Sequence, residues 1–363
     1  MKERLEGGEQ AETTHFLPFP FAYLLKLNSA TYKATTSYSA GGVGRNIAED
    51  LHKLDNHVTF ISAFGSDQNG SFLRNTLPEN AITASLISDT MATATCAIIL
   101  DKSGDCKLHI GDMRIHQEIT PELIYENAHL IEKTPLVCID ANLSCETIDA
   151  ILLLACKYNK PVFYEPTDVF IADKPFQLNP KQYHQIKFMT PNMNELRKIA
   201  QTLKPSLSSS SLPLSSSTHE SALKIDEIAN LCGELRDVVE NIVVTVGCDG
   251  IFMQRFRDAE SGFFNSNLKY IDDDHGKGKL QLRHYPSMTI EKDVKSSSGA
   301  GDAFCAGFIT AMLCGKSEAI CVSVGFEAAL TALRSVHAVP KEFFNKSHAC
   351  WKTSAKFNIV RSE

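Results

Sequence analysis

The sequence lacks the features of proteins that bind nucleic acids or that bind or span membranes. Acidic residues outnumber basic ones, 43 to 36, so the net charge of −7 provides no basic surface for nucleic acid or an anionic membrane. No apolar run reaches the roughly 18 residues of a membrane span. The longest candidate, residues 16–27, is short and interrupted by prolines. We therefore expect a small-molecule partner, with no nucleic acid and no membrane.

Cysteine is plentiful, but the patterns of disulfide and zinc proteins are missing. The eleven cysteines are an odd number, and they form no CxxC pair and no Cys/His cluster at zinc-ligand spacing. The apolar stretch near the N-terminus follows four glutamates and has no small-residue cleavage site, so we expect no signal peptide. Free thiols in a reducing compartment and a cytoplasmic location are expected.

Short apolar runs alternate with segments of helical period, which is typical of an α/β protein with a mostly parallel sheet covered by helices on both faces. A helix is expected over residues 45–54, and another over 147–158 with Ser144 as its N-cap. The runs that resemble buried strands are 57–64, 135–140, 161–165, 186–190 and 241–246.

Three segments fall outside this alternation. Residues 93–112 contain two strand-like runs around a KSGD turn and predict a hairpin in a small β extension. The stretch 204–221 is so rich in serine and proline that we expect a flexible surface loop. The polar stretch 265–279 is expected to be a loop as well.

The stretch SGAGDAFCAGF suggests a site for a negatively charged group. Gly299, Ala300 and Gly301 let consecutive backbone N–H groups point into the start of a helix, where phosphate is favoured. Asp302 beside that site would serve best as the base that takes a proton from an attacking hydroxyl group. The alternative is that Asp302 only caps the helix, and spacing alone leaves both open.

The stretch TPNMNEL follows one predicted strand and opens a helix. Asn192 and Glu195 would therefore lie at the carboxyl end of the sheet, where ligands of open α/β sheets bind. They could hold Mg²⁺ through water and orient phosphates. A capping box is the alternative, with Asn192 as N-cap and Glu195 as its partner.

Two further glycine-rich turns are also candidates for contact with a ligand. In TVGCDG, Thr245 and Gly247 could contact a nucleotide phosphate, whereas Gly250 permits a tight hairpin; a plain turn is the alternative. SAGGVGRN brings Gly41, Gly42 and Asn46 to the start of a helix, where they could approach a polar ligand. Its spacing fits neither the dinucleotide fingerprint nor the P-loop.

These four motifs, in this order, resemble the PfkB/ribokinase family of carbohydrate and nucleoside kinases from about residue 39 to the end. The resemblance implies a ribokinase-like doubly wound, mostly parallel sheet with helices on both faces and a small β-sheet lid, with lid strands around 93–112. Residues 39–363 would form the kinase domain and 1–38 a divergent N-terminal segment. It also implies ATP, Mg²⁺ and a monovalent cation such as K⁺.

The resemblance assigns roles residue by residue. Asp302 resembles the catalytic base, and Gly299, Ala300 and Gly301 the anion hole. Asn192 and Glu195 correspond to the residues that position Mg²⁺. The residues similar to nucleotide contacts are Thr245, Gly247 and Gly250, and those similar to sugar contacts are Gly41, Gly42 and Asn46.

Within the family, Arg45 in GGVGRN and the stretches 109–122, 139–144 and 163–169 are similar to the pseudouridine kinases. That branch implies phosphorylation of the 5'-hydroxyl of pseudouridine, with Asp112 and Asn142 near the nucleoside. It further implies a homodimer through the lid and a functional link to a pseudouridine-5'-phosphate glycosidase.

The chain also departs from the family pattern. The stretch HFLPFPFAYLLKLNSATYKATTSY has neither the glycine pair nor the aspartate of the family's first strand, and Ser296 stands where an acidic residue is usual. Two classes of function therefore stay open. One is a kinase of pseudouridine, or of another ribose-containing nucleoside or sugar. The other is a non-catalytic protein that binds a nucleoside or nucleotide.

Overall fold

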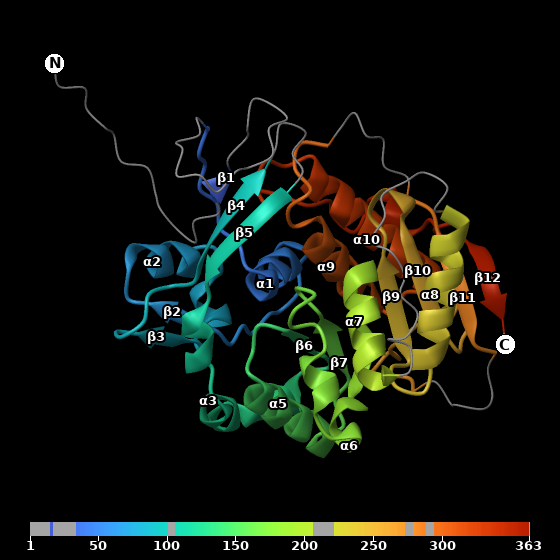
Figure 1. Ribbon diagram of the computed structural model, residues 1–363, viewed down its shortest axis with the longest axis horizontal. Coiled ribbons are helices and arrows are strands. Elements are labelled where there is room, and N and C mark those ends of the chain that lie inside the picture. The colour runs from blue at the N-terminus through green and yellow to red at the C-terminus, as the bar shows by residue number, and fades with distance from the viewer. Residues whose placement is uncertain are drawn as a thin grey trace.

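The structure of the protein is a computed structural model, which describes residues 15–16, 34–100, 106–205, 221–272, 279–287 and 294–362. Its centre is a seven-stranded sheet with strand order β12–β11–β10–β9–β8–β7–β6 (Figure 1). Strands β6 to β9 run parallel, and β9 to β12 pair antiparallel. The strands are β6 Val137–Asp140, β7 Val162–Glu165, β8 Ile186–Met189, β9 Asn241–Thr245, β10 Ile251–Arg255, β11 Gln281–Tyr285 and β12 Asn358–Ser362.

Helices cover both faces of this sheet, as the sequence predicts. Alternate strand residues belong to two separate hydrophobic cores, because successive side chains in a strand point to opposite faces. One core contains residues of α5 Cys145–Lys157, α7 Met193–Leu203 and α8 Ser221–Leu235. The other contains residues of α1 Val43–Lys53, α9 Ala300–Leu313 and α10 Glu318–Leu333. The α/β fold class is thereby confirmed.

The helix boundaries follow local sequence signals. Ser144 caps α5, since its hydroxyl oxygen accepts a hydrogen bond from the Thr147 N–H group at 3.1 Å. α1 begins after Gly42 and ends at Lys53, close to the predicted 45–54. The shorter helices are α2 Gln68–Arg74, α3 Pro121–Glu126, α4 Ala128–Lys133 and α6 Pro180–Tyr183.

The predicted hairpin is present in a small three-stranded sheet. Strands β4 Thr95–Leu100 and β5 Cys106–Asp112 pair antiparallel, and the two-residue strand β1 His15–Phe16 pairs parallel with β4. The turn of the hairpin lies outside the described residues, as do most of the serine-rich stretch and residues 273–278 of the polar stretch. Figure 1 shows this small sheet above α1, on the side of the molecule where α9 begins.

The predicted strand over 57–64 is largely wrong. Only residues 63–65 form a strand, β2 Ala63–Gly65, which pairs with β3 Leu86–Ser88. The backbone before it is engaged elsewhere, because the Phe60 N–H group donates to the Ala81 carbonyl and the Ser62 N–H group to the Ser85 hydroxyl. Among the described strands, β6 consequently has a partner on one side only and forms an edge of the main sheet.

None of the described helices is long and apolar enough to cross a membrane. Ten cysteines within the described ranges are free thiols, four of them buried and four exposed.

Candidate active site

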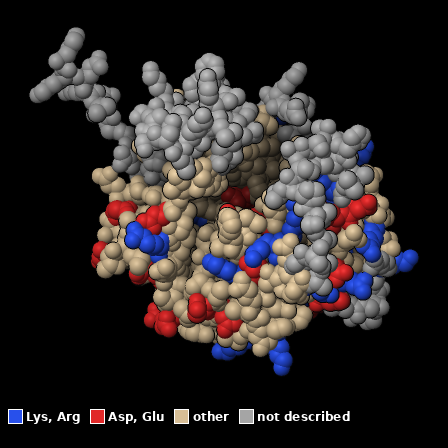
Figure 2. Space-filling view, in the orientation of Figure 1, with Lys and Arg blue, Asp and Glu red and all other residues tan. Residues whose placement is uncertain are grey.

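A cavity of about 1290 Å³ lies between α1, the edge of β6, the small sheet and the start of α9. Its volume exceeds the 300–1,000 Å³ typical of small-ligand sites. In Figure 2 the surface is hollowed beside the small sheet, and acidic atoms are visible inside the hollow. The predicted site residues that line the cavity are Gly41, Gly42, Arg45, Asn46, Asn142, Gly299 and Asp302.

The start of α9 has the backbone that the sequence predicts for an anion site. Gly299 is the N-cap and adopts a left-handed conformation, with φ of 77°. A Cβ atom there would lie 2.0 Å from the Ala338 carbonyl oxygen, so glycine is required by both conformation and space. Gly301 faces open space, since a Cβ atom there would meet nothing within 4 Å. The first N–H groups of a helix have no intrahelical acceptor, and a ligand anion can approach them here.

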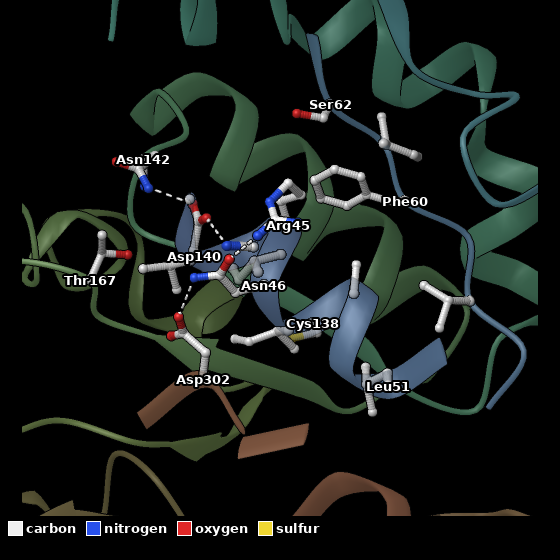
Figure 3. A pocket seen from close by; sticks show the side chains of 18 of the residues that line it. Arg45, Asn46, Leu51, Phe60, Ser62, Cys138, Asp140, Asn142, Thr167 and Asp302 are labelled. Carbon is white, nitrogen blue, oxygen red and sulfur yellow. Dashed lines mark hydrogen bonds between the residues drawn. The ribbon is translucent and has the colours of Figure 1, made fainter. Parts of the chain in front are cut away.

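Asp302, in the first turn of α9, is held by a residue from the opposite end of the chain. Its Oδ2 atom accepts a hydrogen bond of 2.7 Å from the Asn46 Nδ2 atom on α1. Arg45 fixes the other end of the Asn46 amide by donating to its Oδ1 atom. Arg45 itself is buried and also binds the Gly41 carbonyl and the Glu49 carboxylate. The glycine turn and the acid of the GAGD motif are thus joined by one hydrogen-bond network (Figure 3).

The surroundings of Asp302 adjust its basicity. Burial raises its pKa to about 6, although the hydrogen bond from Asn46 and the charge of Arg45 lower it, and the charge of Asp140 raises it. A carboxylate with this pKa is mostly ionised at neutral pH. It is also a stronger base than an ordinary aspartate, which suits proton transfer from a hydroxyl group.

Asp140, at the end of β6, is a cavity residue that the sequence motifs did not single out. Its Oδ2 atom accepts a hydrogen bond of 3.0 Å from the Gly44 N–H group, and its Oδ1 atom accepts one of 2.9 Å from the Asn142 N–H group. A Cβ atom on Gly44 would lie 2.8 Å from the Asp140 Oδ2 atom, so the glycine permits the close approach. In Figure 3, Asp140, Asn46 and Asp302 gather at one end of the cavity, whereas Phe60 and Leu51 line the other.

The next strand end carries another acidic residue. Glu165 closes β7, and its Oε2 atom accepts a hydrogen bond of 2.8 Å from the Thr167 N–H group. Burial raises the pKa of Glu165 well above the usual value, and the charges of Asp302, Glu195 and Asp140 add to the effect. Thr167 has a φ of 66°, a strained conformation for a β-branched residue that is typical of functional loops.

Asn192 and Glu195 form the capping box of α7. The Asn192 side chain accepts from the Asn194 and Glu195 N–H groups, and the Glu195 carboxylate accepts from the Asn192 N–H group. Burial raises the pKa of Glu195 to about 7, partly offset by its hydrogen bond from the Asn192 N–H group. The capping alternative is therefore present in the structure, and a metal role would have to use the remaining oxygen lone pairs.

The predicted nucleotide-binding turn lies beside this capping box. Thr245 ends β9 and forms a β-bridge with Asn192. Gly247 is exposed with φ of 57°, and a Cβ atom there would meet nothing within 4 Å. Gly250 is buried with φ of 94°, and a Cβ atom there would lie 2.1 Å from the Tyr285 carbonyl oxygen. Gly250 is thus required by the β9–β10 hairpin, whereas Gly247 leaves room for a ligand.

Asp112 lies apart from the other predicted substrate residues. It is exposed at the end of β5 and accepts three hydrogen bonds from Arg114, two from the side chain and one from the backbone N–H group, which lower its pKa to about 2. Its neighbours Gly111 and Met113 line the cavity, but Asp112 is not among the lining residues.

The sequence motifs did not identify Asp140 and Glu165 as site residues. Both are acids at the ends of predicted strands, which is the same signal that identified Asn192.

Comparison with known proteins agrees with this geometry. The sequence pattern of the pfkB family of carbohydrate kinases matches residues 20–341. A pseudouridine kinase of Escherichia coli (strain K12) is 28% identical over 272 residues, which cover 74% of this chain and 72% of that protein. A pseudouridine kinase of Arabidopsis thaliana is 23% identical over 340 residues, covering 87% and 88%.

Solved structures show the same fold. The Arabidopsis thaliana ribokinase complexed with ribose and ATP superimposes with a TM-score of 0.63 at 17% identity, covering 92% of this chain and 94% of that one. The likeness extends over nearly the whole of both chains, and the match to the family pattern settles the class of protein. The chain belongs to the pfkB family of carbohydrate kinases and is a phosphotransferase with an alcohol group as acceptor.

Proposed function

We propose that the protein transfers the terminal phosphoryl group of ATP to the 5'-hydroxyl group of pseudouridine. The observation that carries the proposal is Asp302, held by Asn46 at the start of α9 on the wall of the large cavity. A hydroxyl group placed against Asp302 would have its proton acceptor beside it and the N–H groups of the α9 start facing the transferring phosphoryl group.

Different groups take up the proton of the hydroxyl group and the negative charge of the transferred phosphoryl group. The Asp302 carboxylate accepts the proton as the hydroxyl oxygen bonds to phosphorus, and the bond from phosphorus to the ADP oxygen breaks. The N–H groups at the start of α9 stabilise the negative charge on the transferred group. Asn46 keeps the carboxylate oriented, because its amide is fixed at both ends.

The acidic side chains near the site would favour a divalent cation. The charges of Asp302, Glu195 and Asp140 raise the pKa of Glu165, and the charge of Asp140 raises that of Asp302, an effect that a cation would relieve. Mg²⁺ prefers oxygen ligands and often takes one or two carboxylates together with substrate phosphates. Glu195 and Asn192 would hold Mg²⁺ through water, and its charge would offset that of the nucleotide phosphates. A monovalent cation such as K⁺ stays a prediction from the sequence.

The choice of pseudouridine rests on the two relatives named pseudouridine kinase. The test is ADP release by the purified protein with ATP, Mg²⁺ and, separately, pseudouridine, uridine, adenosine or ribose. We expect turnover that is selective for pseudouridine, with the phosphate on the 5' position by phosphorus NMR. Turnover of ribose or adenosine alone would contradict the assignment of pseudouridine as the substrate. Binding without turnover of any acceptor would contradict the proposed phosphoryl transfer.

Three further expectations stay predictions from the sequence. They are a homodimer through the small sheet, a companion pseudouridine-5'-phosphate glycosidase, and a cytoplasmic location. Leu108 and Ile110 of β5 are exposed apolar side chains that such a dimer would cover. Sedimentation of the wild-type protein and of an Ile110→Lys variant would test the dimer.

A further inference from the structure

His116 is an unused polar group in the wall of the cavity. It lies in a 3₁₀ helix, Arg114–Glu118, that follows β5, and its side chain lines the cavity. The imidazole has no hydrogen bond or ion pair with any residue that the structure describes. A polar side chain in this position is free to bind a ligand, and the proposed phosphoryl transfer does not use it.

The environment keeps the His116 ring neutral. Burial lowers its pKa, the nearby Asp140 carboxylate raises it, and the Lys174 ammonium lowers it. The 3₁₀ helix packs against β2 and β3, which contribute no titratable side chain. A neutral imidazole offers one hydrogen-bond donor and one acceptor, whereas the protonated ring offers two donors and no acceptor.

Asp140 links His116 to the reacting end of the cavity. Its carboxylate is within electrostatic reach of both Asp302 and His116, and all three residues line the cavity. Asn142 follows Asp140 in the same loop, and its side-chain amide also lacks a partner among the described residues. A nucleoside with its 5'-hydroxyl group at Asp302 and its sugar beside Asp140 would have His116 and Asn142 within reach of its base.

We propose that His116, together with Asn142, recognises the base and selects pseudouridine over uridine. The inference rests on the proposed function and names the basis of its specificity. In pseudouridine the base is attached through carbon, so both ring nitrogens carry hydrogen. In uridine N1 forms the glycosidic bond and carries none. The acceptor nitrogen of His116 receives the N1–H group of pseudouridine, and the Asn142 amide pairs with the opposite N–H and carbonyl groups.

Uridine would leave this acceptor without a partner inside the cavity. Sites built to bind a substrate N–H or O–H group discriminate strongly against analogues that lack it, because the buried polar group is then unpaired. The discrimination requires the neutral ring, so it is expected to weaken when the pH falls far enough to protonate His116.

The experiment compares kcat/KM for pseudouridine with kcat/KM for uridine in four proteins: wild type, His116→Leu, His116→Gln and His184→Leu. His116→Leu is expected to lower the ratio by about tenfold or more, the loss lying mainly in KM for pseudouridine. His116→Gln, which keeps an acceptor and a donor, is expected to retain most of the ratio and to remove its pH dependence. His184 is exposed at the end of α6 and is not among the residues that line the cavity, so His184→Leu is the control and should leave the ratio unchanged.

An unchanged ratio in His116→Leu would overturn the inference, as would an equal loss in His184→Leu. If the wild-type protein phosphorylates neither nucleoside, the proposed function fails on its own. Calorimetric binding of pseudouridine and uridine to wild type and His116→Leu then decides about His116. Preferential binding of pseudouridine that is lost in the variant would support the base-recognition role, and equal or absent binding of both nucleosides would refute it.

Discussion

The Asn46 side-chain amide donates a hydrogen bond of 2.7 Å to the Asp302 carboxylate, joining two residues that are 256 positions apart in the chain. This bond brings the glycine turn before α1 and the GAGD turn before α9 to the same wall of the cavity. It also favours the ionised form of Asp302 against the effect of burial. The proton acceptor of the proposed reaction is therefore both positioned and tuned by α1.

Replacing Asp302 by Asn should abolish turnover while leaving nucleotide binding in place. The amide has the same shape and can still accept from Asn46, but it cannot take a proton, so kcat should fall by about 10²–10⁴-fold. ADP release and nucleotide titration calorimetry measure the two effects. Asp112→Asn is a suitable control, because that carboxylate pairs with Arg114 away from the cavity. Retained turnover in Asp302→Asn would remove this residue from the role of base.

The pH dependence of the reaction should report the pKa of Asp302. Since the base must be ionised, kcat/KM is expected to rise with pH through about 6 and then level off. In Asn46→Ala the hydrogen bond that favours the ionised form is lost, so the rising limb should move to higher pH. A rising limb at the same pH in wild type and variant would mean that another group controls it.

Asp50 should make the protein less stable as the pH rises. It lies fully buried on α1, and neither of its carboxyl oxygens has a hydrogen-bond partner among the described residues. Burial together with the charge of Asp302 raises its pKa well above the usual value. The native state thus holds a proton that the unfolded state releases above the ordinary pKa, and stability falls by about 1.4 kcal/mol per pH unit from this group. Urea unfolding at pH 5, 6 and 7 measures the slope.

In Asp50→Asn the contribution of this residue to the pH dependence of the unfolding free energy disappears. The variant should therefore become more stable relative to the wild type as the pH rises from 5 to 7. Parallel stability curves for the two proteins would show that native Asp50 is ionised. Glu49→Gln serves as a comparison on the same helix, since Glu49 is paired with Arg45 and Lys53.

Gly299→Ala should destabilise the protein more than Gly315→Ala. Both glycines have positive φ, 77° and 67°, which costs a residue with a side chain about 1–2 kcal/mol. Only at Gly299 would the new Cβ atom meet a backbone carbonyl, that of Ala338. The difference between the two free energies of unfolding therefore isolates the contact at the start of α9. Equal values would mean that the backbone around Ala338 moves aside with no measurable loss of stability.

Hydrogen exchange should identify the open edge of β6. The Val137 and Ala141 N–H groups donate to carbonyls of the β7 side, so in an extended strand the intervening Cys138 and Asp140 N–H groups point the other way, toward the cavity. No described strand pairs with that edge. Cys138 and Asp140 should exchange markedly faster than Val137 and Ala141. Equal protection would show that another segment pairs with β6.

Much of the main sheet could be predicted because its signals are local. The apolar runs of β6, β7, β8 and β9 are short, bounded by turn residues and separated by segments of helical period, which limits the choice of fold. The run at 57–64 has the same composition, yet most of it forms no strand. Its residues bond instead to Ala81 and Ser85, and composition carries no information about that choice.

The sequence by itself determined the turns and helix starts of this protein. A glycine at positive φ such as Gly299, a cap such as Ser144 and the reciprocal cap of Asn192 and Glu195 depend on neighbours within a few residues. The tertiary structure alone decided that Asn46 meets Asp302, that Asp140 meets Gly44, and that His116 faces the same cavity. These contacts join residues that are far apart in the chain, and they form only when the packing of the sheet and helices brings those segments together.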